Sequence, residues 1–261
     1  MSSDDEADDA PRSRGFVTAF ARGLEVIRAF GPGAGRLTLS EVAARTGVDR
    51  AVARRLLMTL VELGLASSDG RRFALTPQVL RLAQAYLGGV GLDRRMQPAL
   101  EALAKRIGES TSLTVLDCPD IVNVARAEAP DRPFRHALTV SARMAAHATA
   151  SGRVLMATLS ADDLENCLVV PLPRYTTHTI TDPMALCRAL AECRDAGFAV
   201  LDGELEEGFA SAAVPLADTT GRIVAALATS SHTGRRDAAS LRREVVPLLQ
   251  AATHEMSELL G

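Results

Sequence analysis

The chain has 261 residues, of which 47% are hydrophobic, so it is long enough for two domains with separate cores and is not disordered as a whole. No apolar run reaches the roughly 18 to 20 residues that a membrane span needs, and the acidic N-terminus lacks the order of a signal peptide. A soluble, cytoplasmic protein without a membrane partner is expected.

Charge is distributed unevenly along the sequence. Residues 1–9 contain five acids and no base, residues 10–90 contain twelve Arg and five acids, and residues 91–261 contain 17 bases and 22 acids, giving −5, +7 and −5. Arginine forms bidentate contacts with phosphate and guanine. We therefore predict a disordered acidic tail over 1–14, then a basic module with a polyanionic partner, then an acidic module.

Residues 15–76 have the pattern of a winged helix-turn-helix domain. Apolar residues recur at helical spacing from Phe16 to Phe30, and the sequence GPGAG ends that first helix. A short second helix can start at Thr38 or Ser40 and end at Gly47.

Asp49 can cap a third helix, after which an Asp-Gly turn between two short strands predicts a hairpin, the wing. On this third helix we expect an inward side made of Val52, Leu56, Thr59, Leu60 and Leu63. The opposite side then carries Arg50, Ala51, Arg54 and Met58, with Arg55 on the flank.

Arginines along a helix can form a solvated face, an ion-pair ladder or a DNA-binding surface. No acid lies one turn from Arg50 or Arg54 on their own face, so a ladder has little support. We interpret Arg50, Ala51 and Arg54 as facing base edges in the major groove of double-stranded DNA. Phosphate contacts are predicted for Arg14, Arg22, Arg55, Arg71 and Arg72.

The segments FARGLEVIRAF, LTLSEVAARTG, ARRLLMTLVELG and FALTPQVLRLA resemble the N-terminal domain of the isocitrate lyase regulator (IclR) family of bacterial transcription factors. The resemblance extends over nearly the whole chain. Within the family, FVTAFARGLEVIRAF and DRAVARRLLMTLVELG are most similar to the branch that controls protocatechuate, 4-hydroxybenzoate and β-ketoadipate catabolism. The resemblance implies operator binding, a homodimer or homotetramer, and a response to a small organic acid.

Residues 77–91 are predicted to form a linker helix, although a core helix of the first domain is an alternative. Residues 92–261 begin with a helix to about 108. The predicted strands are TSLTVLD, IVNVARAE, FRHALTV, GFAVLDG, FASAAVPL and GRIVAALATS, and the predicted helices are 148–158, 160–168, 183–195 and 237–260. This order favours an α+β domain with a mainly antiparallel sheet, and the resemblance implies a GAF-like effector-binding domain.

Catalytic signatures are missing from this second module. The sequence has no nucleophile elbow, no HExxH and no Gly-rich phosphate loop, so an enzyme, a cofactor and a metal are not expected. His147 and the pair Asp162-Asp163 are interpreted as local helix-start residues. Cys118, Cys167, Cys187 and Cys193 form no CxxC pair, and we expect four reduced thiols.

The segment AAHATASGRVLMATL is the most informative part of the second module. Thr149 can cap a helix whose first amides, at Ala150 and Ser151, could approach a carboxylate, but an ordinary capped helix fits the residues equally well. The resemblance favours the effector site and adds Asp202, Ser211 and Ser230 to it. The family often has Gly at the positions of Ser141 and Ala150, Pro at Ala145 and Ser at Ala228.

The expected effector is an aromatic carboxylate such as protocatechuate or 4-hydroxybenzoate, with a small oxoacid such as glyoxylate or pyruvate as the alternative. An ionised Asp202 would suit a phenolic hydroxyl. Apolar walls are predicted from Leu113, Val115, Met144 and Leu227, each of which could instead be core. Two other readings remain open: a C-terminal module that only oligomerises, and an enzyme with a DNA-binding appendage.

Overall fold

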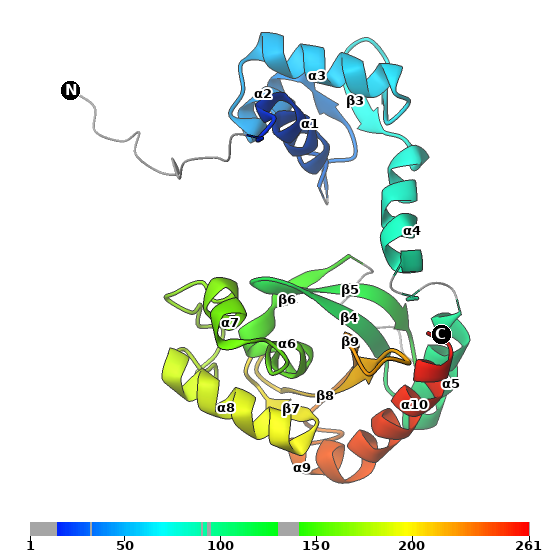
Figure 1. Cartoon of the computed structure of the whole chain (residues 1–261), viewed down its shortest axis with the longest axis vertical. Helices are drawn as coiled ribbons and strands as arrows, with labels where there is room; N and C mark the ends of the chain where they lie inside the picture. Colours follow the sequence, from blue (N-terminus) through cyan, green and yellow to red (C-terminus); the bar gives the residue numbers. More distant parts are fainter. Residues whose placement is uncertain (1–14, 32, 90, 93–94, 130–140, 261) are drawn as a thin grey trace, which may run out of the picture. The chain divides into compact units, whose positions relative to one another are not determined.

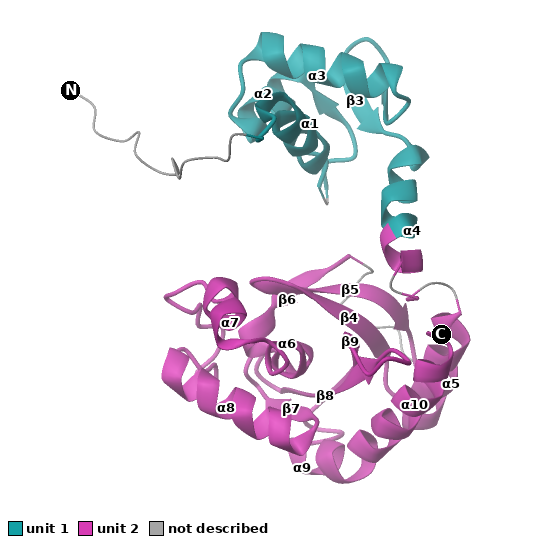
Figure 2. Ribbon diagram, viewed as in Figure 1, with its two compact units in different colours: residues 1–85 teal, residues 86–261 magenta. Residues whose placement is uncertain are grey.

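The computed structural model describes residues 15–31, 33–89, 91–92, 95–129 and 141–260. The chain divides into two compact units, Met1–Ala85 and Tyr86–Gly261 (Figures 1 and 2). The division falls inside the helix expected as a linker. The predicted tail over 1–14 and Arg14 lie outside the described residues.

The N-terminal unit has the predicted helix-turn-helix and wing. Its elements are α1 (Thr18–Arg28), β1 (Leu37–Thr38), α2 (Leu39–Thr46), α3 (Arg50–Glu62), β2 (Ala66–Ser68) and β3 (Arg72–Leu75). The strands form an antiparallel sheet in the order β1-β3-β2. The two-residue strand β1 was not predicted, because two residues carry no alternation.

Local capping fixes the helix-turn-helix. The Thr38 side chain accepts from the Glu41 amide while the Glu41 carboxylate accepts from the Thr38 amide, a capping box that starts α2. Gly47 ends α2 with φ 66°, a left-handed conformation that glycine adopts without steric cost. Asp49 Oδ1 then accepts from the amides of Ala51 and Val52, both at 2.9 Å, and starts α3.

The buried side of α3 differs in part from the prediction. Ala53, Leu57 and Leu60 are its buried residues, whereas Thr59 and Leu63 are exposed. The prediction omitted Ala53 and Leu57, both fully buried, and so it displaced the apolar stripe around the helix. On α1, Val26 is buried while Phe20 and Leu24 are exposed, as is Phe16 before the helix.

The predicted linker helix is present as a 3-10 turn (Pro77–Val79) followed by α4 (Leu80–Gly89). None of the ten residues of α4, all of them described, is buried. The alternative of a core helix of the first domain is therefore wrong. In the part of the chain that the structure describes, no helix is long and apolar enough to cross a bilayer.

The C-terminal unit is a six-stranded sheet between two layers of helices (Figure 1). Its helices are α5 (Met96–Ile107), α6 (Ala150–Met156), α7 (Ala161–Cys167), α8 (Pro183–Ala196), α9 (Ala238–Ser240) and α10 (Val246–Glu258), with a 3-10 turn at Ala146–Ala148 and a π turn at Leu241–Val245. Its strands are β4 (Thr111–Asp117), β5 (Asp120–Ala127), β6 (Arg143–Ala145), β7 (Ala199–Asp202), β8 (Phe209–Ala217) and β9 (Ile223–His232).

All strand pairs are antiparallel, in the order β6-β5-β4-β9-β8-β7, which confirms the predicted mainly antiparallel sheet. The short strand β6 was not predicted. The expected strand FRHALTV lies outside the described residues.

The two faces of the sheet have different cores. On one face, α5 and α10 pack over Leu113, Val214 and Leu227; on the other, α6 and α8 pack over Ile121 and Ala213. Because side chains alternate along a strand, Thr114 lies on the α6 face while Leu113 lies on the α5 face. This alternation decides which residues can line a site beside α6.

The expectation of four reduced thiols is wrong for one pair. Cys118, at the turn between β4 and β5, forms a disulfide with Cys167 at the end of α7. Forty-nine residues separate the two cysteines, and the sheet brings them together, which sequence spacing alone does not reveal. Cys187 and Cys193 are free thiols.

Candidate DNA-binding surface and effector pocket

The outer side of α3 carries the predicted base-reading residues. Arg50, Ala51, Arg54 and Arg55 are all exposed. No acid in the described part of the chain pairs with any of these three arginines, and a single exposed apolar residue, Met58, lies among them. The surface therefore has full positive charge available for a polyanion.

The wing adds further positive charge. Arg71 and Arg72 are exposed around a turn in which Asp69 Oδ1 accepts from their amides at 3.0 and 2.7 Å. These bonds, first that of Arg72, hold the pKa of Asp69 below its ordinary value, so the turn keeps its anchor at neutral pH. Arg36 lies 3.4 Å from Asp69 and was not predicted as part of this surface. Arg22 is exposed on α1.

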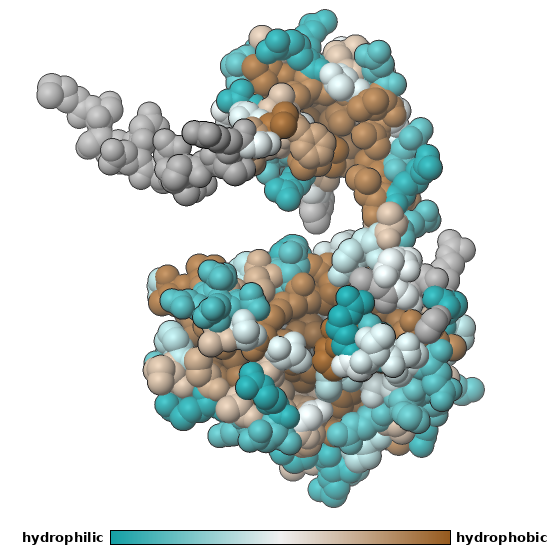
Figure 3. Space-filling view, in the orientation of Figure 1, coloured by the Kyte–Doolittle hydropathy of each residue, from teal (hydrophilic) through white to brown (hydrophobic). Residues whose placement is uncertain are grey.

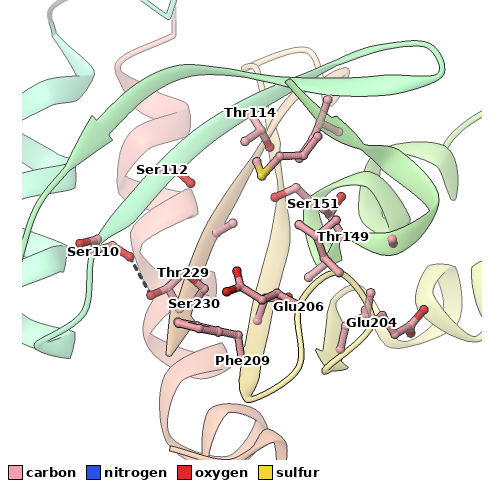
Figure 4. A pocket seen from close by; sticks show the side chains of 18 of the residues that line it. Ser110, Ser112, Thr114, Thr149, Ser151, Glu204, Glu206, Phe209, Thr229 and Ser230 are labelled. Carbon is pink, nitrogen blue, oxygen red and sulfur yellow. Dashed lines mark hydrogen bonds between the residues drawn. The ribbon is translucent and has the colours of Figure 1, made fainter. Parts of the chain in front are cut away.

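A pocket of about 160 Å³ lies between the start of α6 and the sheet (Figure 4). It is smaller than the roughly 300 Å³ at the lower end for drug-sized ligands, so it suits a small molecule. The strands contribute Ser112, Thr114, Ile121, Arg126, Met144, Leu201, Phe209, Ser211, Ala228, Thr229 and Ser230. The remaining walls are Ser110 before β4, Ala148, Thr149, Ala150, Ser151 and Gly203–Glu206.

Four of the five predicted effector residues line this pocket: Ala150, Ser151, Ser211 and Ser230. Ser211 and Ser230 are paired across β8 and β9, so their side chains lie on one face. The structure places Asp202 outside the pocket, because it follows the lining residue Leu201 on β7 and faces the other way, where it is exposed.

Three of the four predicted apolar walls lie in the opposite core. Leu113, Val115 and Leu227 pack against α5 and α10, and only Met144 lines the pocket. Their strand neighbours Ser112, Thr114 and Ala228 face the pocket instead. The prediction chose the residues that point to the wrong face of each strand. The wall of this pocket is therefore more polar than predicted.

The start of α6 is tightly built. Thr149 Oγ1 accepts from the Gly152 amide at 3.2 Å and caps the helix. A Cβ atom at Gly152 would lie 2.0 Å from the carbonyl oxygen of Ala146, so only glycine fits there. Ser151 is 5% exposed and faces the cavity.

An arginine that the sequence analysis missed also lines the pocket. Arg126 Nε donates to Glu128 at 2.7 Å, and Glu128 also accepts from Ser110 Oγ at 2.9 Å. These contacts, first that of Arg126, lower the pKa of Glu128, which keeps the pair ionised. Strict period-2 alternation from Ile121 would turn Arg126 to the opposite face. The irregularity in the β4–β5 register between Leu113 and Thr114 instead places Arg126 opposite Ser112 on the pocket face, and the sequence carries no sign of that irregularity.

Behind the pocket lies a buried ion pair. Arg153 Nη2 donates to Glu204 Oε2 at 2.6 Å and Arg153 Nε donates to the His147 carbonyl at 2.7 Å. Burial lowers the pKa of Arg153, an effect that Glu204 opposes. Thr179 Oγ1 donates to the Glu204 carbonyl at 2.6 Å. The pair thereby fixes the pocket wall at Glu204 to the start of α6.

The position of Ser141 accounts for one family departure. Ser141 has φ 70°, the left-handed region that glycine adopts readily, and the family often has Gly there. Its amide donates to the Asn123 carbonyl at 2.7 Å. Ser141 therefore adopts a backbone conformation that glycine would adopt with less strain.

Two family models match the chain: "IclR helix-turn-helix domain" over residues 19–70 and "Bacterial transcriptional regulator IclR C-terminal" over residues 84–258. The "Pca regulon regulatory protein" of Pseudomonas putida is 37% identical over 94% of this chain and 84% of that protein.

The "p-hydroxybenzoate hydroxylase transcriptional activator" of Acinetobacter baylyi is 34% identical over 95% of this chain and 94% of that protein. Among solved structures, an IclR homologue from Microbacterium hydrocarbonoxydans complexed with 4-hydroxybenzoate is 26% identical, with a TM-score of 0.78 over 93% of this chain and 99% of that one. The similarity thus covers both units.

Proposed function

Because the chain belongs to the IclR family of bacterial transcriptional regulators, we propose that it controls aromatic-acid catabolism genes in the cytoplasm by coupling operator binding to a small aromatic carboxylate. The observation that carries the proposal is the small pocket beside α6, which combines apolar walls with hydroxyl groups and an arginine. The relatives named above for aromatic-acid pathways support this effector class.

DNA recognition is assigned to α3 and the wing. Arg50 and Arg54 read base edges with Ala51 between them, while Arg22, Arg55, Arg71 and Arg72 contact phosphates. Arg14 is assigned to the phosphate backbone from its sequence position alone. Base contacts give sequence specificity, whereas phosphate contacts strengthen binding to any duplex.

Fluorescence anisotropy on operator and scrambled duplexes tests this division. Arg54→Ala should weaken operator binding by about 1 to 3 kcal/mol and leave binding to the scrambled duplex nearly unchanged. Arg72→Ala is the matched control. It should weaken binding to both duplexes alike and reduce the slope of log K against log salt concentration by about one. Equal losses on both duplexes for Arg54→Ala would contradict its base-reading role.

The effector occupies the cavity with its carboxylate toward Arg126. Glu128 accepts from Nε of that guanidinium and so orients it. A guanidinium has five N–H donors in a planar arrangement, which suits the two oxygens of a carboxylate. The first-turn amides of Ala150 and Ser151 and the hydroxyls of Ser211 and Ser230 supply further polar contacts. Helix α6 has only seven residues, so we assign the carboxylate to the guanidinium of Arg126 and not to the helix start.

Titration calorimetry with benzoate, 4-hydroxybenzoate, protocatechuate and glyoxylate tests the effector class. Arg126→Gln should raise the Kd of every aromatic acid by roughly ten-fold or more, because a charge-assisted bond is lost. Arg143→Gln is the matched control, since that exposed arginine pairs with Asp117 and Asp120 outside the pocket. Heat from glyoxylate alone would replace the aromatic proposal with a small-oxoacid regulator.

A homo-oligomer is also proposed, because apolar side chains are exposed on two helices (Figure 3). Phe20 on α1 is 68% exposed and Leu82 on α4 is 62% exposed, in company with Phe16, Val17, Leu80 and Tyr86. A two-fold dimer would cover such faces and read a palindromic operator, and two dimers would make a tetramer. Light scattering should give a dimer or tetramer, and a monomeric mass with operator bound would contradict this.

A further inference from the structure

Asn123, in the middle of β5, has a buried side chain without a partner. The residue is 1% exposed, and neither Nδ2 nor Oδ1 has a hydrogen-bond partner among the described residues. Its backbone, by contrast, is paired: the amide donates to the Ala142 carbonyl at 3.0 Å, and the carbonyl accepts from Ser141. An amide side chain buried with both polar atoms unpaired is rare in folded proteins and requires an explanation.

The register of the sheet places Asn123 beside residues of the pocket wall, although its own side chain does not line the cavity. It lies directly opposite Thr114 across β4 and β5, and Thr114 lines the pocket. Ile121, two residues earlier on the same strand, also lines the pocket, whereas Val122 between them packs against the opposite core. Asn123 therefore faces α6. Figure 4 shows Thr114 beside Ser151 at this end of the cavity.

A flexible side chain lies next to this position. Met144, on β6, pairs with Ile121 in the register and lines the same pocket while remaining half-buried. Methionine has three rotatable bonds and adapts to irregular spaces. Access of a ligand to Asn123 requires that Met144 or another lining side chain rotate.

The chemistry of an amide selects the group that it can bind. Asn123 offers two N–H donors and one acceptor, all unused. A hydroxyl group can donate to Oδ1 and accept from Nδ2, so it satisfies both atoms. A carboxylate can only accept, so it would place its charge against Oδ1, and an unsubstituted ring edge would leave both atoms unpaired.

We propose that Asn123 binds the ring hydroxyl of the aromatic acid effector and so distinguishes hydroxylated acids from benzoate; this rests on the proposed function. The orientation follows from the strand: Arg126, assigned to the carboxylate, lies three residues further along β5, about 10 Å away, and the irregularity of the β4–β5 register between Leu113 and Thr114 turns it to the same face as Asn123. The two polar ends of one aromatic ring then bind to two residues of one strand. Asn123 takes the role that the sequence analysis gave to Asp202.

Asn123→Leu tests the proposal, because leucine has nearly the same size and no polar atom. Calorimetry on the full-length protein would compare 4-hydroxybenzoate, 3-hydroxybenzoate and benzoate. We expect the wild type to bind at least one hydroxylated acid ten-fold or more tightly than benzoate. In Asn123→Leu that ratio should fall to about one, with the Kd of benzoate changed by less than three-fold. Asp202→Asn, outside the pocket, should keep the wild-type ratio.

Two outcomes would overturn the assignment, and they differ. If the wild type binds aromatic acids and Asn123→Leu raises the melting temperature but keeps the ratio, Asn123 is a structural residue or binds water, and the proposed function stands. If the wild type binds no aromatic acid, both proposals fall. Asn123→Ala provides a second test if the leucine variant does not fold, as judged by its melting curve, and the same loss of ratio is expected.

Discussion

Replacing Glu204 by Gln should strongly destabilise the C-terminal unit. The Arg153 side chain is 5% exposed and that of Glu204 is 12% exposed, and 2.6 Å separates Nη2 from Oε2. Glutamine keeps an amide oxygen that can accept from Nη2, but the negative charge is lost, so the guanidinium remains buried with its charge uncompensated. Breaking one side of a buried pair costs about 3 to 5 kcal/mol, which corresponds to a decrease in melting temperature of roughly 6 to 20 °C for a unit of this size.

Denaturant unfolding followed by circular dichroism measures this loss, and a double-mutant cycle isolates the pair. Arg153→Met combined with Glu204→Leu removes both charges and should be less destabilising than the sum of the two single changes. Glu244→Gln is the control, because Glu244 lies 2.7 Å from Arg243 but both side chains are exposed, so less than about 1 kcal/mol is expected. A loss below about 1 kcal/mol for Glu204→Gln would refute the reasoning.

Two further predictions concern the thiols and one backbone position. Alkylation at pH 7.5 should label the exposed Cys187 quickly and Cys193 hardly at all, because burial raises the pKa of the Cys193 thiol to about 11, an effect that Arg153 opposes. Cys118 and Cys167 should react only after reduction. Rapid labelling of either one in untreated protein, measured by peptide mass spectrometry, would contradict the disulfide. Ser141→Gly should raise the free energy of unfolding by up to about 1 kcal/mol. Glycine removes the steric strain of a side chain at φ 70°, and this gain outweighs the greater freedom of glycine in the unfolded chain. A decrease in the denaturant midpoint would contradict the prediction.

Local signals in the sequence were sufficient for the N-terminal unit. Three local features define its elements: Asp49 caps α3, Gly47 ends α2, and an Asp-Gly turn forms the wing. Each acts within four residues, so it can be predicted from the neighbouring sequence alone. The exposure of Arg50 and Arg54 followed from helical periodicity. Strand β1, which was not predicted, and the buried side of α3, which was predicted incorrectly, cannot be obtained from local signals, because both depend on the elements that pack against them.

Apart from Met144, the predicted residues that line the pocket either begin a helix or were named by the resemblance. Ala150 and Ser151 follow a visible cap, and Ser211 and Ser230 came from the family. The disulfide partner of Cys118 and the ion-pair partner of Arg153 are 49 and 51 residues away in sequence. Nothing in local spacing identifies such partners, because the sheet order brings them together.

The errors in the pocket wall have one physical origin. On β4 the hydroxyl residues Ser112 and Thr114 alternate with Leu113 and Val115, but both sets are covered by helices, so the alternation alone does not say which face holds the pocket. On the α6 face the hydroxyls of Ser112 and Thr114 face a cavity, where they need not be desolvated by packing, whereas Leu113 and Leu227 fill the dry core beneath α5 and α10. Polar residues in a doubly covered strand therefore indicate the face that holds the ligand. By the same reasoning, Asn123 belongs to the binding face and not to the core, because a dry core would contain no partner for its amide.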